Sequence, residues 1–207
     1  DKVDSLEPAN PAKMFLDIET DNQGRVPDVQ IASEFVLCVT VFSNDTYTTF
    51  IWRNDFSMGK QPKIIHDTLH ETIYFRDEKR MLTGLLDFIA TEEPDIISGW
   101  NVIHFDLTYL INRMKRLGID YSKLSPMNKV YIDEKHGDVI IKGVAIVDLL
   151  TVYRNFSSWT EGLKESYSLD FIGQEVIGVG KSNNSSNVKW MWKYAPDELV
   201  AYNLNDT

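Results

Sequence analysis

The stretch KMFLDIET at residues 13–20 decides how the rest of the chain is interpreted. Its apolar residues are typical of a buried β-strand that ends in acidic residues. Because side chains alternate along a strand, Asp17 and Glu19 point to the same side. Two carboxylates held this close repel each other unless a cation lies between them. The ordinary alternative is a strand end that exposes two acids to solvent.

The segments around this strand predict an α/β fold, because strands alternate with helices along the chain. Periodicity and turn residues predict a hairpin of strands 35–42 and 46–52, a helix from Asp77 to Pro94, a strand at 95–98 and a helix from Asp106 to Gly118. Residues 53–72 carry no pattern that assigns them.

The second half of the chain shows a different pattern. Two short apolar runs predict a β-hairpin at residues 130–142 with a charged tip at 133–138. Helices are expected at 168–177 and from Pro196 onward. The last helix is cut off at Thr207, which predicts that residues 1–207 are one domain of a longer protein, with 1–12 as a leading segment.

Composition narrows the class of protein. The chain has 31 acidic and 21 basic residues, a net charge of −10, and one cysteine. A single cysteine excludes an internal disulfide framework and a cysteine-built zinc site. The acidic balance counts against a simple nucleic-acid-binding module and fits a protein that gathers carboxylates around divalent cations. With neither a signal segment nor a bilayer-length apolar run, we expect a cytoplasmic protein without a membrane partner.

Two further acids, Asp106 and Asp206, are candidate metal ligands beside the pair on the first strand. Asp106 stands at a predicted helix start, where its ordinary role would be an N-cap. Tyr202 and Asp206 are four residues apart on the last helix and so share one face, for which a solvated helix end is the alternative. Four carboxylates without sulfur ligands suit Mg²⁺ or Mn²⁺.

The motifs FLDIET, GWNVIHFD and YNLND together resemble the three exonuclease motifs of the 3′–5′ proofreading domain of family B replicative DNA polymerases, in the DEDDy class. The segments ISGWNVIHFDLTYLINRMK, LSP and YSLDFIG look most like polymerases of large tailed bacteriophages. The likeness covers residues 13–207. It implies a ribonuclease H-like fold, with a mixed five-stranded sheet, flanking helices and the hairpin near 130–142.

The resemblance also implies a set of functional residues. Asp17, Glu19, Asp106 and Asp206 would hold two divalent ions, Mg²⁺ or Mn²⁺, and Tyr202 would orient the attacking water. The expected reaction releases deoxynucleoside 5′-monophosphates from the 3′ end of DNA. The positions that would contact single-stranded DNA are Asn101, Phe105, Ser168, Leu169 and Lys181. For Phe105 the alternative is core packing, and for Ser168 helix capping.

Other residues carry weaker expectations. Asp148 and Asp170 are expected to be structural caps. The pair of tryptophans at 190 and 192 is expected to pack in the core or against a polymerase body rather than to stack on bases.

The resemblance implies partners too: the single-stranded 3′ end of a primer, the remainder of a DNA polymerase in the same chain, and in some family members a sliding clamp. For a phage-encoded protein the location would be the host cytoplasm. Two alternatives stay open. One is a stand-alone DEDD-type nuclease acting on RNA or short oligonucleotides, and the other is a non-catalytic nucleic-acid-binding domain.

Overall fold

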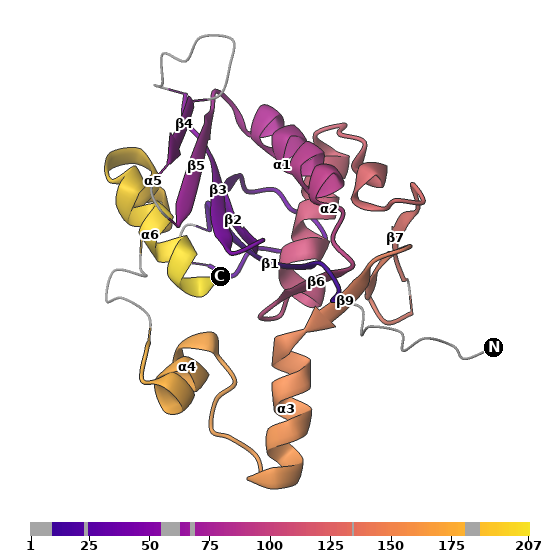
Figure 1. Cartoon of the computed structure of the whole chain (residues 1–207). Helices are drawn as coiled ribbons and strands as arrows, with labels where there is room; N and C mark the ends of the chain where they lie inside the picture. Colours follow the sequence, from indigo (N-terminus) through magenta and orange to yellow (C-terminus); the bar gives the residue numbers. More distant parts are fainter. Residues whose placement is uncertain (1–9, 23–24, 55–62, 67–68, 134, 181–186) are drawn as a thin grey trace, which may run out of the picture.

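A computed structural model describes residues 10–22, 25–54, 63–66, 69–133, 135–180 and 187–207. Within these residues seven strands form one mixed sheet in the order β4-β5-β3-β2-β1-β6-β9 (Figure 1). Their bounds are β1 Lys13–Thr20, β2 Val36–Ser43, β3 Thr46–Trp52, β4 Lys63–His66, β5 His70–Phe75, β6 Ile96–Gly99 and β9 Ala145–Asp148. The mixed sheet with flanking helices is the ribonuclease H-like fold expected from the sequence.

The sheet has seven strands where the resemblance implied five: β1, β2, β3 and β6 were predicted from the sequence, and β4, β5 and β9 were not. Strand β1 lies inside the sheet, antiparallel to β2 and parallel to β6. Asn44 and Asp45 both have positive φ and join β2 to β3 in the tight turn that the hairpin pattern predicted. The added strands fall partly in residues 53–72, which the sequence left unassigned.

Helices cover both faces of the sheet. Helix α1 (Glu78–Glu92) packs on β2, β3 and β5, while α6 (Pro196–Asp206) packs on β1, β2 and β3 from the other side (Figure 1). Asp77 caps α1 by accepting a hydrogen bond from the Arg80 backbone N–H, as predicted. The core side of α1 is formed by five buried apolar residues, Met81, Leu82, Leu85, Leu86 and Ile89. In the part of the chain that the structure describes, no helix is both long and apolar enough to cross a bilayer.

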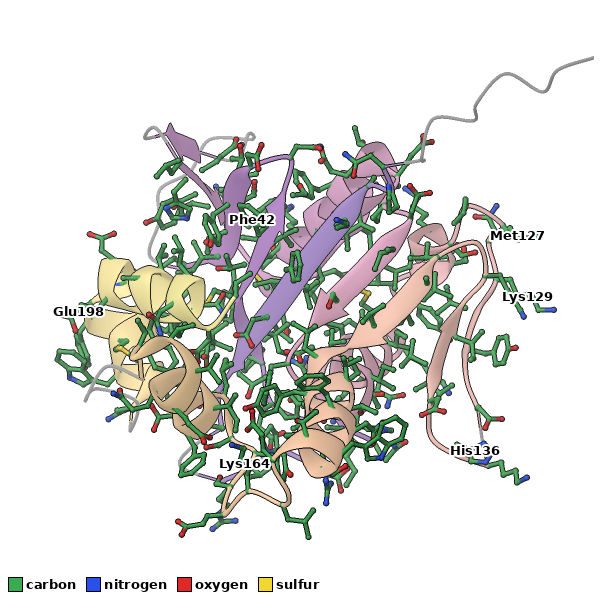
Figure 2. All side chains as sticks on the ribbon, turned by 60° about the horizontal axis from the view of Figure 1, so that its bottom comes forward. Phe42, Met127, Lys129, His136, Lys164 and Glu198 are labelled. Atoms are coloured by element: carbon green, nitrogen blue, oxygen red, sulfur yellow. The ribbon has the colours of Figure 1, made fainter. Side chains whose placement is uncertain are left out.

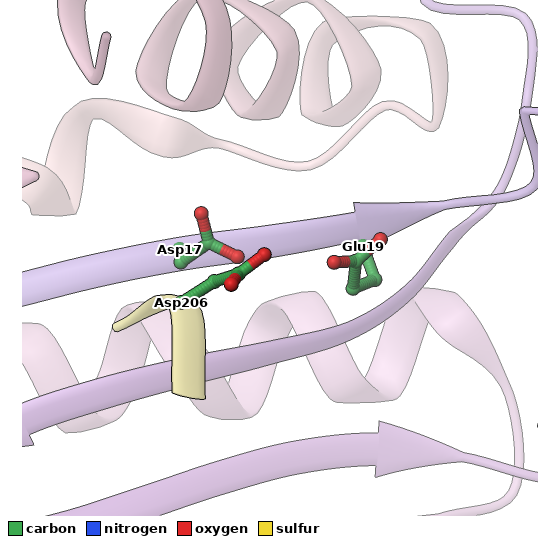
Figure 3. A group of neighbouring side chains, drawn as sticks. All are labelled: Asp17, Glu19 and Asp206. Atoms are coloured by element: carbon green, nitrogen blue, oxygen red, sulfur yellow. The ribbon is translucent and has the colours of Figure 1, made fainter. Parts of the chain in front are cut away.

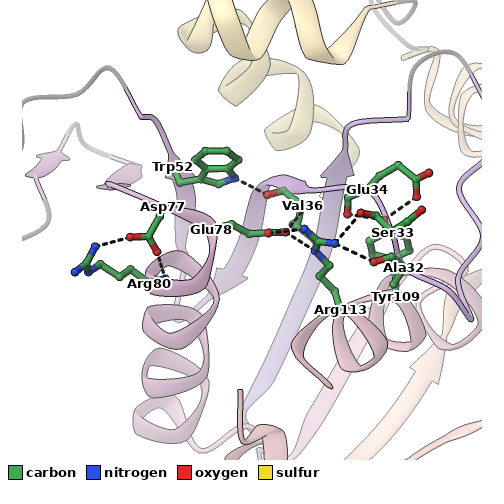
Figure 4. A network of polar contacts seen from close by, with 10 residues as sticks. All are labelled: Ala32, Ser33, Glu34, Val36, Trp52, Asp77, Glu78, Arg80, Tyr109 and Arg113. Atoms are coloured by element: carbon green, nitrogen blue, oxygen red, sulfur yellow. Dashed lines mark hydrogen bonds and ion pairs between the residues drawn. The ribbon is translucent and has the colours of Figure 1, made fainter. Parts of the chain in front are cut away.

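A buried ion pair ties α1 to α2 (Thr108–Arg116). Arg113 and Glu78 are about 95 % buried and bond through two hydrogen bonds of 2.8 and 2.7 Å. Glu78 also accepts the N–H of Val36, and Arg113 donates to the carbonyls of Ala32 and Ser33 (Figure 4). These hydrogen bonds compensate the two charges for the loss of water, so the pair can stay buried. The network anchors the start of β2 beside β1.

The predicted helix from Asp106 begins later than expected. Residues Ile103–Leu107 form one π-helical turn, η1, and the regular helix α2 starts at Thr108. Asp106 therefore does not cap α2: the residue before that helix is Leu107, and it makes no side-chain capping bond. Gly118, with φ of +64°, follows α2 where a C-terminal glycine was expected.

The predicted hairpin is present and stands apart from the main sheet. Strands β7 (Val130–Ile132) and β8 (Val139–Ile141) pair antiparallel as a separate two-stranded sheet. His136 lies at its tip, away from the main sheet, with its side chain 60 % exposed (Figure 2). A 3₁₀ turn, η2 (Tyr121–Leu124), connects α2 to this hairpin.

The remaining helices lie at the carboxyl ends of the parallel strands (Figure 1). Helix α3 (Leu149–Thr160) continues directly from β9, α4 (Leu169–Ile177) follows it, and α5 (Val188–Tyr194) precedes α6. Sequence periodicity assigned neither α3 nor α5. One side of α3 and the residues after it expose Val152, Phe156, Trp159 and Leu163 at helical spacing.

Candidate metal centre

Three carboxylates meet beside the middle of the sheet. Asp17 and Glu19 project from the same side of β1, and Asp206 comes from the last turn of α6 (Figure 3). One oxygen from each lies within 4.8 Å of the others. Among the residues that the structure describes, this is the one group of three or more acids, cysteines and histidines placed closely enough to hold an ion. The alternation of β1 and the position of α6 therefore bring together residues that are 187 to 189 positions apart in the chain.

The position of Asp206 depends on how α5 and α6 are anchored. The Trp192 indole donates to the carbonyl of Trp52 at 2.6 Å, and the two rings pack with centroids 4.7 Å apart. Arg53 donates to the carbonyls of Trp192 and Lys193. Met191 is buried, whereas Trp190 is 47 % exposed. The expected core packing of the tryptophan segment is thus correct for Trp192, and it holds α5, the helix before α6, against the end of β3.

Asp106 is buried next to this group without joining it in the same 4.8 Å set. Pairing of β1 with β6 stops at Phe15, so the N–H of Ile18 has no strand partner on that edge. The Asp106 carboxylate accepts this N–H at 3.2 Å. Burial raises the pKa of Asp106 well above its ordinary value, the Asp17 carboxylate raises it further, and the hydrogen bond from Ile18 acts in the opposite direction.

The turn before Asp106 requires a close approach of two backbones. A Cβ on Gly99 would lie 2.6 Å from the carbonyl oxygen of Leu16, so only glycine fits where β6 ends beside β1. Asn101 follows with φ of +64°, a conformation that asparagine tolerates better than most residues. Asp148 caps α3 through the Thr151 N–H, as expected, and also accepts the N–H of Ile103. These contacts hold η1, and with it Asp106, beside β1.

Sequence reasoning missed Asn203, which contacts the site directly. This residue is fully buried on α6, and its amide donates to Asp17 Oδ2 at 2.6 Å. Its carbonyl oxygen lies 3.5 Å from the Cys38 sulfur, which donates to it. Cys38 is the partner of Glu19 in the β1–β2 register. Burial raises the pKa of the Cys38 thiol well above its usual range, and Glu19 and Asp17 add to this shift.

Tyr202 and Leu169 are the two predicted residues that the structure places near Asp206 in the fold. Tyr202 is 6 % exposed and sits one turn before Asp206 on α6. Leu169 lines a pocket of about 60 Å³ together with Asn205 and Asp206. Ser168 caps α4 by accepting the Phe171 N–H, which is the alternative that its sequence context offered.

Two other predicted contacts have different outcomes. Phe105 is half-buried against the core, with its ring centroid 6.1 Å from that of Tyr109, so it serves core packing and keeps one part accessible. Lys181 lies outside the described residues.

The arrangement suits a divalent cation. Asp17, Glu19 and Asp206 are half-buried or nearly buried and carry like charges, so a cation between them would remove their mutual repulsion. Their oxygens are the hard donors that Mg²⁺ and Mn²⁺ prefer. Asp106 is buried and bonds to the N–H of Ile18, the residue next to Asp17 on β1, so its carboxylate lies on the same part of that strand.

Comparison with known proteins agrees with the fold and covers the first two of the three motifs. Residues 2–172 match the family model for the exonuclease domain of DNA polymerase family B. The chain is 31 % identical over 140 residues to the DNA-directed DNA polymerase of Escherichia phage RB69, covering 64 % of the chain and 15 % of the relative. It is 31 % identical over 157 residues to DNA polymerase II of Escherichia coli (strain K12), covering 66 % and 18 %.

A third relative is the DNA-directed DNA polymerase of Enterobacteria phage T4, which is 27 % identical over 154 residues, covering 70 % of the chain and 17 % of the relative. The chain thus spans less than a fifth of the length of each of these three proteins.

Proposed function

The chain belongs to the exonuclease domains of family B DNA polymerases, and from this premise we propose that it hydrolyses the 3′-terminal phosphodiester of DNA. The product would be one deoxynucleoside 5′-monophosphate per cycle. The observation that carries the proposal is the meeting of Asp17, Glu19 and Asp206 within 4.8 Å, next to the buried Asp106. A family member that had lost nuclease activity would have no need to keep these acids together.

The proposed role of each acid is the one that the family resemblance implies. Asp17, Glu19 and Asp206 would hold one divalent ion, and Asp17 with Asp106 would hold a second. When bound, two such ions supply an activated water and stabilise the attacking and leaving oxygens of the phosphodiester. The part of the chain that we assign to chemistry is therefore β1, η1 and α6.

The protein's own residues position the substrate. The Tyr202 hydroxyl would orient the attacking water by hydrogen bonding to it. Leu169, in its small pocket beside Asp206, would contact the terminal nucleotide. The accessible part of Phe105 would pack against an unstacked base, as aromatic rings do with single strands. Asn101, Ser168 and Lys181 would contribute further contacts to the strand.

We also propose that this domain works as the proofreading part of a longer polymerase. The relatives are several times longer than the matched region. In addition, Val152, Phe156 and Trp159 form an exposed apolar stripe along one side of α3, and such stripes mark interaction surfaces. The remainder of a polymerase, the 3′ end of a primer and a sliding clamp are the partners that this role implies.

The test is digestion of a 5′-labelled single-stranded DNA with the purified protein in Mg²⁺, Mn²⁺ or Ca²⁺, with a matched RNA strand in parallel. We expect a ladder that shortens from the 3′ end by one nucleotide at a time in Mg²⁺ or Mn²⁺, on DNA in preference to RNA. Preference for RNA would favour a stand-alone nuclease of the same class. Binding of DNA without cleavage in any of these ions would contradict the proposal.

A further inference from the structure

Asn203 on α6 bridges from an acid of the candidate metal centre to a second strand. Its amide nitrogen donates to Asp17 Oδ2 at 2.6 Å, and its amide oxygen accepts from the Cys38 thiol at 3.5 Å. Asp17 belongs to β1 and Cys38 to β2, so the amide spans two neighbouring strands. Asn203 and Cys38 are both completely buried.

The chemistry of the three groups sets the direction of the amide. A carbonyl oxygen facing the Asp17 carboxylate would be repelled, whereas an NH₂ group is attracted by it. The Cys38 thiol is a weak donor and an acceptable partner for the carbonyl oxygen at the other end. Because burial keeps this thiol protonated, it retains the hydrogen that the bond to Asn203 requires. The amide is thereby held with its donor toward the acid.

From these contacts we infer that Asn203 is a positioning residue for the metal centre, because its bond to Oδ2 holds the Asp17 carboxylate in the place where it lies close to Glu19 and Asp206. The inference rests on the proposed function, in which Asp17 is the ligand shared by both ions. Without the bond from Asn203, the side chain of Asp17 could rotate away from the two other acids. The same bond also joins α6 to β1, three residues before Asp206.

Loss of a hydrogen-bonding partner behind a metal ligand lowers metal affinity by about 10- to 100-fold in well-studied sites. We therefore expect that Asn203→Ala and Asn203→Leu raise the Mn²⁺ dissociation constant by about that factor. The leucine variant still fills the buried position and removes both the donor to Asp17 and the acceptor for Cys38. A purely structural role would lower the melting temperature without changing metal affinity in the protein that remains folded.

The experiment is a Mn²⁺ titration by electron paramagnetic resonance, combined with thermal unfolding followed by circular dichroism. Asn112→Ala is the matched control, since the amide of Asn112, which lies on α2, donates to the carbonyl of Val29. This control should lose a comparable hydrogen bond and keep the affinity of the unaltered protein. Equal Mn²⁺ affinity in folded Asn203→Leu and in the unaltered protein would overturn the inference.

Two further outcomes are separable. If the unaltered protein binds no Mn²⁺, the proposed metal centre is incorrect, and Asn203 has no metal ligand to position. If both Asn203 variants fail to fold, Cys38→Ala carries the test, because it releases the other end of the amide and leaves Asn203 in place. We expect a smaller loss of affinity there in the same direction, and an unchanged affinity would overturn the inference.

Discussion

Replacing Asp17 by asparagine should stabilise the metal-free protein and weaken its response to metal. The Asp17, Glu19 and Asp206 oxygens lie within 4.8 Å of one another, a separation at which two unit charges repel by roughly 1 kcal/mol in water and by about 3.5 kcal/mol at an effective dielectric constant near 20. Asparagine removes one charge and keeps an oxygen that can accept from Asn203. Because the site is only partly exposed, we expect a gain of about 1–3 kcal/mol in the free energy of unfolding.

The assay is thermal unfolding in EDTA and again in excess Mn²⁺. For a chain of this size a change of 1 kcal/mol moves the midpoint by roughly 2–4 °C, so the expected rise in EDTA is about 2–12 °C. In Mn²⁺ at 100 times the dissociation constant, the unaltered protein should gain about 2.7 kcal/mol, and Asp17→Asn should gain much less.

Glu165→Gln is the matched control, because it removes one exposed negative charge on the loop before α4 and should change neither midpoint. A lower melting temperature of Asp17→Asn in EDTA, or an undiminished stabilisation by Mn²⁺, would refute the reasoning that these acids repel one another and bind a cation.

Three further outcomes are expected. Asp17→Ala should abolish cleavage of labelled single-stranded DNA, whereas Tyr202→Phe should only slow it, since water orientation alone is lost; equal inactivity would give the hydroxyl a larger role. Glu78→Ala should lower the free energy of unfolding in urea by about 3–5 kcal/mol, because it leaves Arg113 as an uncompensated buried charge. Lys123→Ala breaks an exposed ion pair and should lower it by under about 1 kcal/mol. Similar losses in the two variants would show that the first pair is not effectively buried. We expect the hairpin at 130–142 to act as a steric wedge between primer and template, because its acidic tip is unsuited to binding phosphates. Deleting residues 133–138 in a full-length polymerase should therefore slow excision from paired primer ends and spare single strands, and an equal loss on both substrates would indicate a damaged active site instead.

Local patterns predicted those parts of the fold whose own residues determine their structure. The apolar runs of β2 and β3, joined by Asn44 and Asp45, identify a hairpin because the turn needs positive φ. Helix α1 was predicted from its Asp77 cap and apolar spacing. The hairpin at 130–142 and the proline that opens α6 are equally local signals.

The missed elements depend on contacts between distant segments. Strand β5 pairs parallel with β3, and this pairing, more than its mixed sequence HETIYF, makes it a strand. The π-helical turn at 103–107 exists because Asp148 and Ile18 bond to its residues, so no local pattern separates it from an ordinary helix start.

In the candidate site, the acids were identified by the resemblance of the three motifs to a known family. The alternation of side chains along β1 predicted that Asp17 and Glu19 share a side. The partner role of Asn203 could not be predicted in the same way. An asparagine between Tyr202 and Asp206 has no periodic signature, and its contact with Asp17 arises only when α6 packs on β1. A buried polar residue on the inner face of a helix near candidate ligands is the signal that could have identified it.

The most direct test of the central claim is an anomalous difference map from crystals of the protein grown with Mn²⁺. The account predicts a peak between Asp17, Glu19 and Asp206, with oxygen ligands near 2.0–2.6 Å from the ion, and a second peak on the side of Asp17 that faces Asp106. Strong anomalous density elsewhere on the surface, with none between these three carboxylates, would contradict it.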